Sequence, residues 1–169
     1  MDRSRAPRFS RSAVGERLGG FIYGTLIVLA VVVAGARAYP HDAGRIAALV
    51  VVTSVVFWLA HVYAHGVAHS VAHDEHLSLA ELRYVARREA SILEAAVAPL
   101  AALLLGAFGV LSTRTAVWVA FGLGLVVLAV EGFTFARVER LGWLGTLVVI
   151  GTNVGLGLAL VALKVFLTH

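Results

Sequence analysis

The sequence predicts an all-α protein: a polytopic transmembrane bundle of about five spans whose third helix extends into the cytoplasm. Hydrophobic residues make up 60% of the 169 residues, against roughly 45–50% in soluble domains. Several apolar stretches approach or exceed the roughly 20 residues that a helix needs to cross a bilayer. Apolar and polar residues do not strictly alternate, which disfavours membrane-spanning strands.

Five stretches are expected to cross the membrane: residues 19–38, 45–72, 91–111, 115–135 and 143–167. The stretch that leads into the third span contains no glycine or proline from Ser78 up to Pro99, which lies within the span. One long helix is therefore expected to begin at the membrane surface and continue into the bilayer. Pro99 should kink it, because proline removes a backbone donor and crowds the preceding turn.

The basic residues predict the orientation. Arginines gather in the N-terminal segment and in the second and fourth loops, and the positive-inside rule places such loops in the cytoplasm. The N-terminus is then cytoplasmic and the C-terminus outside, with residues 1–18 as a basic cytoplasmic segment and 19–169 as the bundle. The arginines in question are Arg3, Arg5, Arg8, Arg11, Arg17, Arg83, Arg87, Arg88, Arg137 and Arg140.

The composition also excludes several functions. The chain has no cysteine, which removes disulfides, thiolate metal sites, cysteine nucleophiles and iron–sulfur clusters. Its arginines form no basic stripe with interleaved aromatics, so no nucleic acid partner is expected. The lipid bilayer is the expected partner. Glycines four residues apart, such as Gly20 with Gly24 and Gly151 with Gly155, favour close helix packing within the bundle or in a homo-oligomer.

The stretch "AHVYAHGVAHSVAHDEH" holds five of the seven histidines. Residues four apart lie on one side of a helix, so His61, His65, His69 and His73 are expected to form a slowly rotating stripe. A rise of about 1.5 Å per residue places His61 just past the bilayer centre and His65 in the inner leaflet. His69 and the later histidines then reach the cytoplasmic interface.

Two acids and one amide are expected near the same stripe. Glu94 lies one turn inside the third span and Glu131 about one turn from the end of the fourth, at roughly the depth of His65 and His69. Asn153, near the middle of the fifth span, is a candidate partner for His61. Both acids also fit a simpler interpretation, in which they reach the headgroups or pair with nearby arginines.

Three functions remain open for this polar layer. A chain of histidines and carboxylates suits a proton or small-cation pathway through His61, His65, His69, Glu94, Glu131 and Asn153. His61, His65, His69 and Glu94 are alternatively ligands for Zn²⁺ or another divalent metal, in a sensor or an enzyme. Haem is disfavoured because the intramembrane histidines share one helix. Finally, the polar residues suit a structural or assembly subunit whose helices they fasten together. No catalytic residue is predicted.

Four stretches, "ERLGGFIYGTLIVLAVV", "FWLAHVYAHGVA", "SILEAAVAPLAALLLGAFGVLS" and "LGLALVALKVFL", resemble a group of small actinobacterial integral membrane proteins of unknown function. The resemblance covers nearly the whole chain, and "FWLAHVYA" is its most recognisable part. It implies a bacterial inner-membrane protein with no stated activity. It also implies that His61 and Glu94 belong to the shared pattern, because other members often lack the later histidines.

Overall fold

The computed structural model describes residues 6–73 and 78–167, with side chains omitted at 6–14, 16, 69, 71–73, 81, 163–165 and 167. All regular structure in this part of the chain is helical, which confirms the predicted all-α class. The helices are α1 (Ala6–Ala38), α2 (Ala43–His73), α3 (Leu79–Arg88), α4 (Ser91–Glu94), α5 (Val97–Ala107), α6 (Thr113–Val138) and α7 (Trp143–Leu167).

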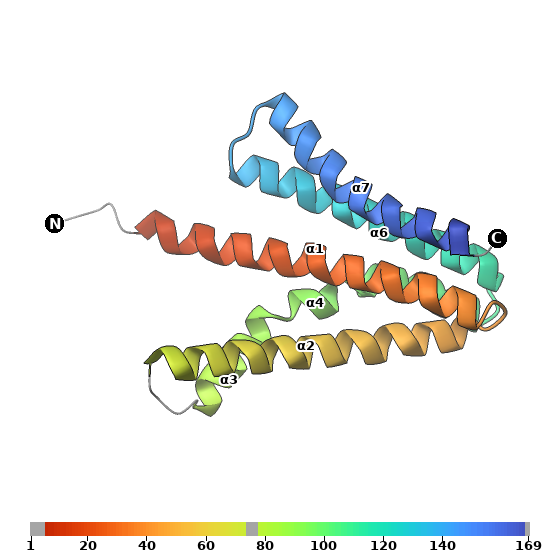
Figure 1. Ribbon diagram of the computed structural model, residues 1–169, viewed down its shortest axis with the longest axis horizontal. Coiled ribbons are helices and arrows are strands. Elements are labelled where there is room, and N and C mark those ends of the chain that lie inside the picture. Colours follow the sequence, from red (N-terminus) through yellow and green to blue (C-terminus); the bar gives the residue numbers. More distant parts are fainter. Residues whose placement is uncertain (1–5, 74–77, 168–169) are drawn as a thin grey trace.

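Helix α1 lies at the centre of the bundle. It packs against α2, α4, α6 and α7, with α2 on one side and the α6–α7 pair on the other (Figure 1). The core between these helices consists mainly of apolar side chains, among them Leu29 and Phe121, which are almost completely buried. Among the described helices, α1, α2, α6 and α7 each carry a stretch long and apolar enough to cross a membrane.

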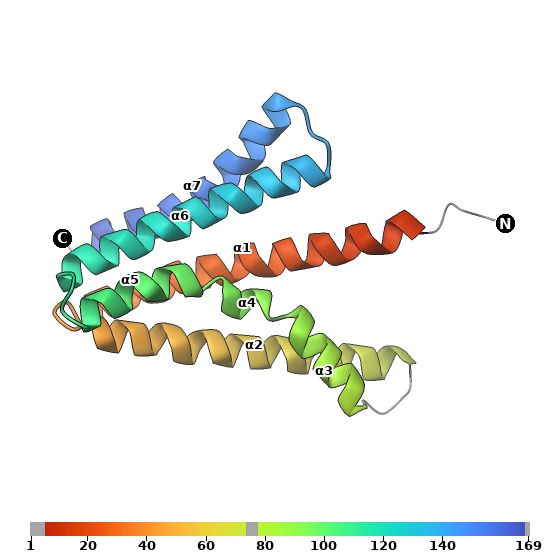
Figure 2. The same ribbon diagram turned by 180° about the vertical axis from the view of Figure 1, so that it is seen from behind.

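The third span is bent near Pro99, as predicted, and a second break at Glu89 and Ala90 divides the expected long helix further. It consists of α3, α4 and α5, and the two parts Leu82–Glu94 and Val97–Ala107 meet at an angle of 53°. Together they begin at the end of the bundle where α2 ends and finish at the end where α6 begins (Figure 2). Counting this bent pair as one span gives the five predicted from the sequence.

Pro99 explains one of the two breaks in this span. It has no N–H with which to bond the Ala95 carbonyl, and its ring would crowd that carbonyl in a continuous helix. The helix is accordingly interrupted at Ala95 and Ala96, and Pro99 sits in the first turn of α5, where a backbone donor is not needed. The other break, at Glu89 and Ala90, has no glycine or proline to mark it.

Helix α1 also runs through the boundary drawn between residues 18 and 19. Leu18 is already buried in the bundle, and Arg17 forms an ion pair with Glu94 of α4. The basic N-terminal segment and the first span therefore share one helix, and the described part of the segment continues directly into the bundle.

Candidate functional site

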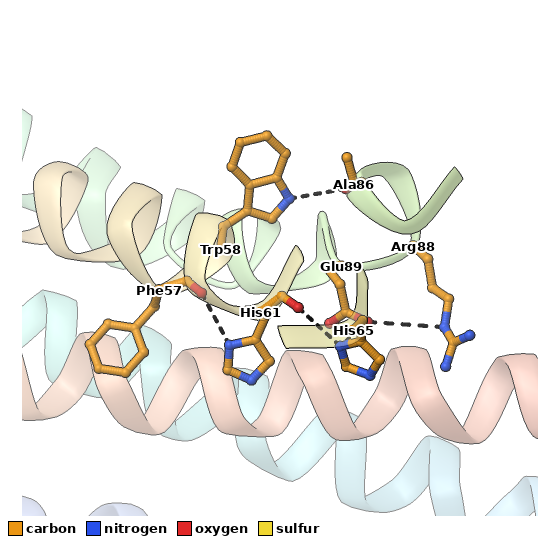
Figure 3. Close-up of polar contacts among 7 residues, drawn as sticks. All are labelled: Phe57, Trp58, His61, His65, Ala86, Arg88 and Glu89. Carbon is orange, nitrogen blue, oxygen red and sulfur yellow. Dashed lines mark hydrogen bonds and ion pairs between the residues drawn. The ribbon is translucent and has the colours of Figure 1, made fainter. Parts of the chain in front are cut away.

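Two histidines project from α2 toward α1. His61 and His65 are one turn apart, and their ring centroids are separated by 6.5 Å. The His61 ring lies against Tyr23 of α1, with 5.2 Å between the centroids. Figure 3 shows both rings on the same side of α2. The predicted stripe is therefore present for these two residues.

Each ring is anchored to its own helix through Nδ1. His61 Nδ1 lies 3.0 Å from the Phe57 carbonyl oxygen, and His65 Nδ1 lies 3.1 Å from the His61 carbonyl oxygen. A carbonyl only accepts hydrogen bonds, so Nδ1 carries the hydrogen in both rings. Each neutral ring then keeps an unprotonated Nε2, the nitrogen that can accept a proton.

The carboxylate beside this pair is Glu89, which the sequence analysis did not select. Its Oε1 lies 3.7 Å from His65 Nδ1 and 4.0 Å from Arg88 Nε, and its side chain is only 10% exposed (Figure 3). A carboxylate this buried requires partners that compensate for lost hydration. The His65 imidazole and the Arg88 guanidinium are in place to do so.

Trp58 holds the Glu89 segment against α2. Its indole Nε1 donates a hydrogen bond to the Ala86 carbonyl oxygen at 3.0 Å, which joins α2 to α3 (Figure 3). Glu89 follows three residues later, at the break between α3 and α4. This contact between α2 and α3 holds Glu89 beside His65.

Glu94 pairs with an arginine and not with a histidine. Glu94 Oε2 accepts a hydrogen bond from Arg17 Nη2 at 2.8 Å, and the two side chains are 45% and 66% exposed. Glu94 ends α4, a helix that packs on α1 beside Arg17. This arrangement matches the simpler interpretation of Glu94 as an acid paired with an arginine near a helix end.

Glu131 lines a different space, between α1 and α6. A cavity of about 230 Å³ is bounded there by Arg17, Leu18, Phe21, Glu131 and Thr134. Neither His61 nor His65 lines it. The single polar layer expected from the sequence is thus divided, with Glu94 and Glu131 near Arg17, and His65 near Glu89 with His61 beside it.

Asn153 connects two helices instead of reaching His61. Its side chain is buried and its Nδ2 donates to the Leu128 carbonyl oxygen at 3.3 Å. The same nitrogen packs against Gly132, where even a Cβ atom would lie only 3.0 Å away. The predicted pairing with His61 is replaced by this contact between α6 and α7.

The remaining predicted positions lie beyond what the structure describes. His69 belongs to α2, but its side chain and that of His73 are outside the described side chains. Among the side chains that are described, no three His, Asp or Glu residues gather as a metal centre would require. Of the proposed metal ligands, His61 and His65 are neighbours, whereas Glu94 pairs with Arg17.

Comparison with known proteins adds no functional assignment. No protein-family model matches the chain, and neither a curated protein nor a solved structure is similar to it.

Proposed function

We propose that this protein conducts or exchanges protons across a bacterial inner membrane, with its N-terminus in the cytoplasm. The observation that carries the proposal is the pair formed by His65 and the buried Glu89, with His61 one turn deeper along α2. Histidine is the side chain best suited to bind and release protons near neutral pH. Ionisable groups inside a membrane bundle are costly and typically mark such pathways.

In the proposed relay, a proton binds Nε2 of His65 and converts the ring into an imidazolium. Its Nδ1–H remains bonded to the His61 carbonyl, and the negative charge of Glu89, with Oε1 3.7 Å from Nδ1, stabilises the added positive charge. The ring centroids of His65 and His61 are too far apart for a direct hydrogen bond, but a bridging water suits such a separation. The proton then passes from Nε2 of His65 through water to Nε2 of His61.

A proton fits this site better than a metal cation does. Protonation needs one free imidazole nitrogen at a time, and each ring keeps Nε2 for that purpose. A divalent metal needs three or four ligands at one point, and the described side chains bring no such set together.

The test is proton flux into proteoliposomes that hold a pH-sensitive dye, with protein purified without a His-tag. Glu89→Gln should lower the flux severalfold, because the imidazolium of His65 loses the negative charge beside it. His65→Ala should lower it at least as far, because it removes the proton carrier. Glu94→Gln is the matched control and should leave the flux near the wild-type value, since Glu94 pairs with Arg17.

Two results would overturn the proposal. A wild-type protein that conducts no more protons than empty vesicles has no relay. Equal flux in wild type, His65→Ala and Glu89→Gln would show that protons cross without this pair. Circular dichroism of each variant establishes that the helices are retained.

A further inference from the structure

Ser54 carries an unusual hydroxyl near the middle of the α2 span. The residue is 3% exposed, and its Oγ atom is buried with no hydrogen-bond partner among the residues that the structure describes. Thr25, Thr134 and Thr152 instead donate to the carbonyl four residues earlier in their own helices. Leaving a buried hydroxyl without a hydrogen bond is unfavourable. We therefore expect Ser54 to bind a partner that is not part of the chain.

The break in the third span lies at the same level of the bundle as Ser54. Helix α5 runs antiparallel to α2, and its Gly106 packs against Ala43 at the start of α2. Ser54 follows Ala43 on α2 by as many residues as Ala95 precedes Gly106 in the third span. Ser54 and Ala95 therefore lie at about the same level. The contacts of α1 agree to within about one helical turn, because Gly24 packs against Ala95 and Tyr23 contacts Phe57, which follows Ser54 on α2.

This level of the bundle offers several oxygen atoms. The Ala95 carbonyl has no helical donor, because Pro99 stands four residues later. Thr25 of α1 is fully buried, and its hydroxyl oxygen keeps a lone pair after donating to Phe21. Discontinuous helices near the midplane provide ion and proton sites in membrane proteins for this reason. A buried water needs two to four such groups.

His61 is close enough to continue the path to this level. Its Nδ1 bonds to the Phe57 carbonyl, so the ring lies over the turn that precedes His61 on α2. About one helical turn, roughly 5 Å, then separates the ring from the level of Ser54. One water molecule spans such a gap with two hydrogen bonds.

We propose that Ser54 binds a water molecule at the helix break, and that this water is the next group in the proton relay beyond His61. The inference rests on the proposed function, and it extends the pathway from the Glu89 end of α2 to the middle of the bundle. Ser54 acts as a positioning residue for the water and need not itself ionise.

Water at Ser54 can be tested without measuring transport. Because the natural chain has no cysteine, Ser54→Cys introduces a single thiol of nearly the same size. Ag⁺ added to the proteoliposomes should reach this thiol through water and protect it from later alkylation in denaturant, as read by intact mass. Val50→Cys, one turn away and fully buried, is the control and should remain unprotected. Equal protection of the two thiols overturns the proposal.

Proton flux then tests the relay role. Ser54→Ala should lose at least as much flux as Glu89→Gln, while Thr53→Ala, a change of the neighbouring hydroxyl, should lose little. A conducting wild type with unchanged flux in Ser54→Ala overturns the inference and leaves the proposed function standing. A wild type that conducts nothing overturns the proposed function and the relay role together, whereas the Ag⁺ result still decides whether water reaches Ser54.

Discussion

At the scale of single residues, Asn153 illustrates how an amide acts inside an apolar bundle. Its Nδ2 reaches a backbone carbonyl of the neighbouring helix at Leu128, and the absence of a side chain at Gly132 gives it room. Hydrogen bonds between membrane helices are modest in strength, because the unfolded protein in the membrane also finds partners. Asn153 should therefore contribute to stability and leave transport unaffected.

Asn153→Ala should lower the free energy of unfolding by about 0.6 kcal/mol, and by no more than about 1.7 kcal/mol. Reversible unfolding in mixed micelles measures this change. The matched control is Thr152→Ala on the adjacent exposed position, where the hydroxyl donates only within its own helix. Proton flux that falls in Asn153→Ala while the stability is unchanged would contradict a purely structural role.

Glu89 and Glu94 differ in how strongly each depends on its charged partners. Glu94 and Arg17 are both substantially exposed, and an exposed ion pair typically contributes little because solvent screens it. Glu89 is almost fully buried, so removing its partners leaves a charge that nothing hydrates. This contrast is the physical basis for using Glu94→Gln as the control for Glu89→Gln.

At the scale of helices, α1 approaches the backbone of α4 closely at Gly24. A Cβ atom at Gly24 would lie 3.0 Å from the Ile92 backbone and 3.1 Å from the Ala95 side chain. Backbone atoms cannot move aside as a flexible side chain can. The glycine therefore sets the distance between α1 and the broken span that carries Glu89.

Gly24→Ala should destabilise the bundle by about 1–3 kcal/mol, the usual cost of an added methyl group in a packed interior. Gly19→Ala on the same helix is the control, since a Cβ atom there meets nothing within 4 Å. The control should be neutral or slightly stabilising, because alanine favours a helix. Thermal unfolding in detergent compares the two, and equal midpoints would show that α1 and α4 can separate freely.

The elements differ in how far the sequence predicts them. Apolar length predicts each span, and the spacing of His61 and His65 predicts their shared side of α2, because both depend on local helix geometry. Pro99 marks one break by its chemistry. The break at Glu89 has no such mark, and a span drawn from residue 91 included Glu94 and left Glu89 outside it. Which acid meets a histidine depends on tertiary packing, here on the contact of Trp58 with α3.

At the scale of the whole molecule, most of the described arginines lie at one end of the bundle, and fewer lie at the end where α1 meets α2. Arg17 lies toward the start of α1, Arg87 and Arg88 end α3, and Arg137 lies in the last turn of α6. These parts of the three helices share one end, opposite the connection between α1 and α2 (Figure 1). The positive-inside rule then predicts that this end faces the cytoplasm.

Two single cysteines test both this orientation and the number of spans. His41→Cys lies in the exposed connection between α1 and α2, and Gly142→Cys in the exposed connection between α6 and α7. With five spans and a cytoplasmic N-terminus, a membrane-impermeant maleimide should label Cys at position 41 in intact cells. The cysteine at 142 should react only after lysis, and the cysteine-free wild type serves as the background control.

Two other patterns of labelling have distinct physical meanings. If only position 142 reacts in intact cells, the bundle lies in the opposite orientation, and protons entering the cell would meet His61 before Ser54. If both positions react, the chain crosses four times, and the bent pair of helices returns to the side from which it entered. The helix break at Ala95 would then be the tip of a re-entrant segment. The five-span prediction requires the opposite ends of the bundle shown in Figure 1 to face opposite sides of the membrane.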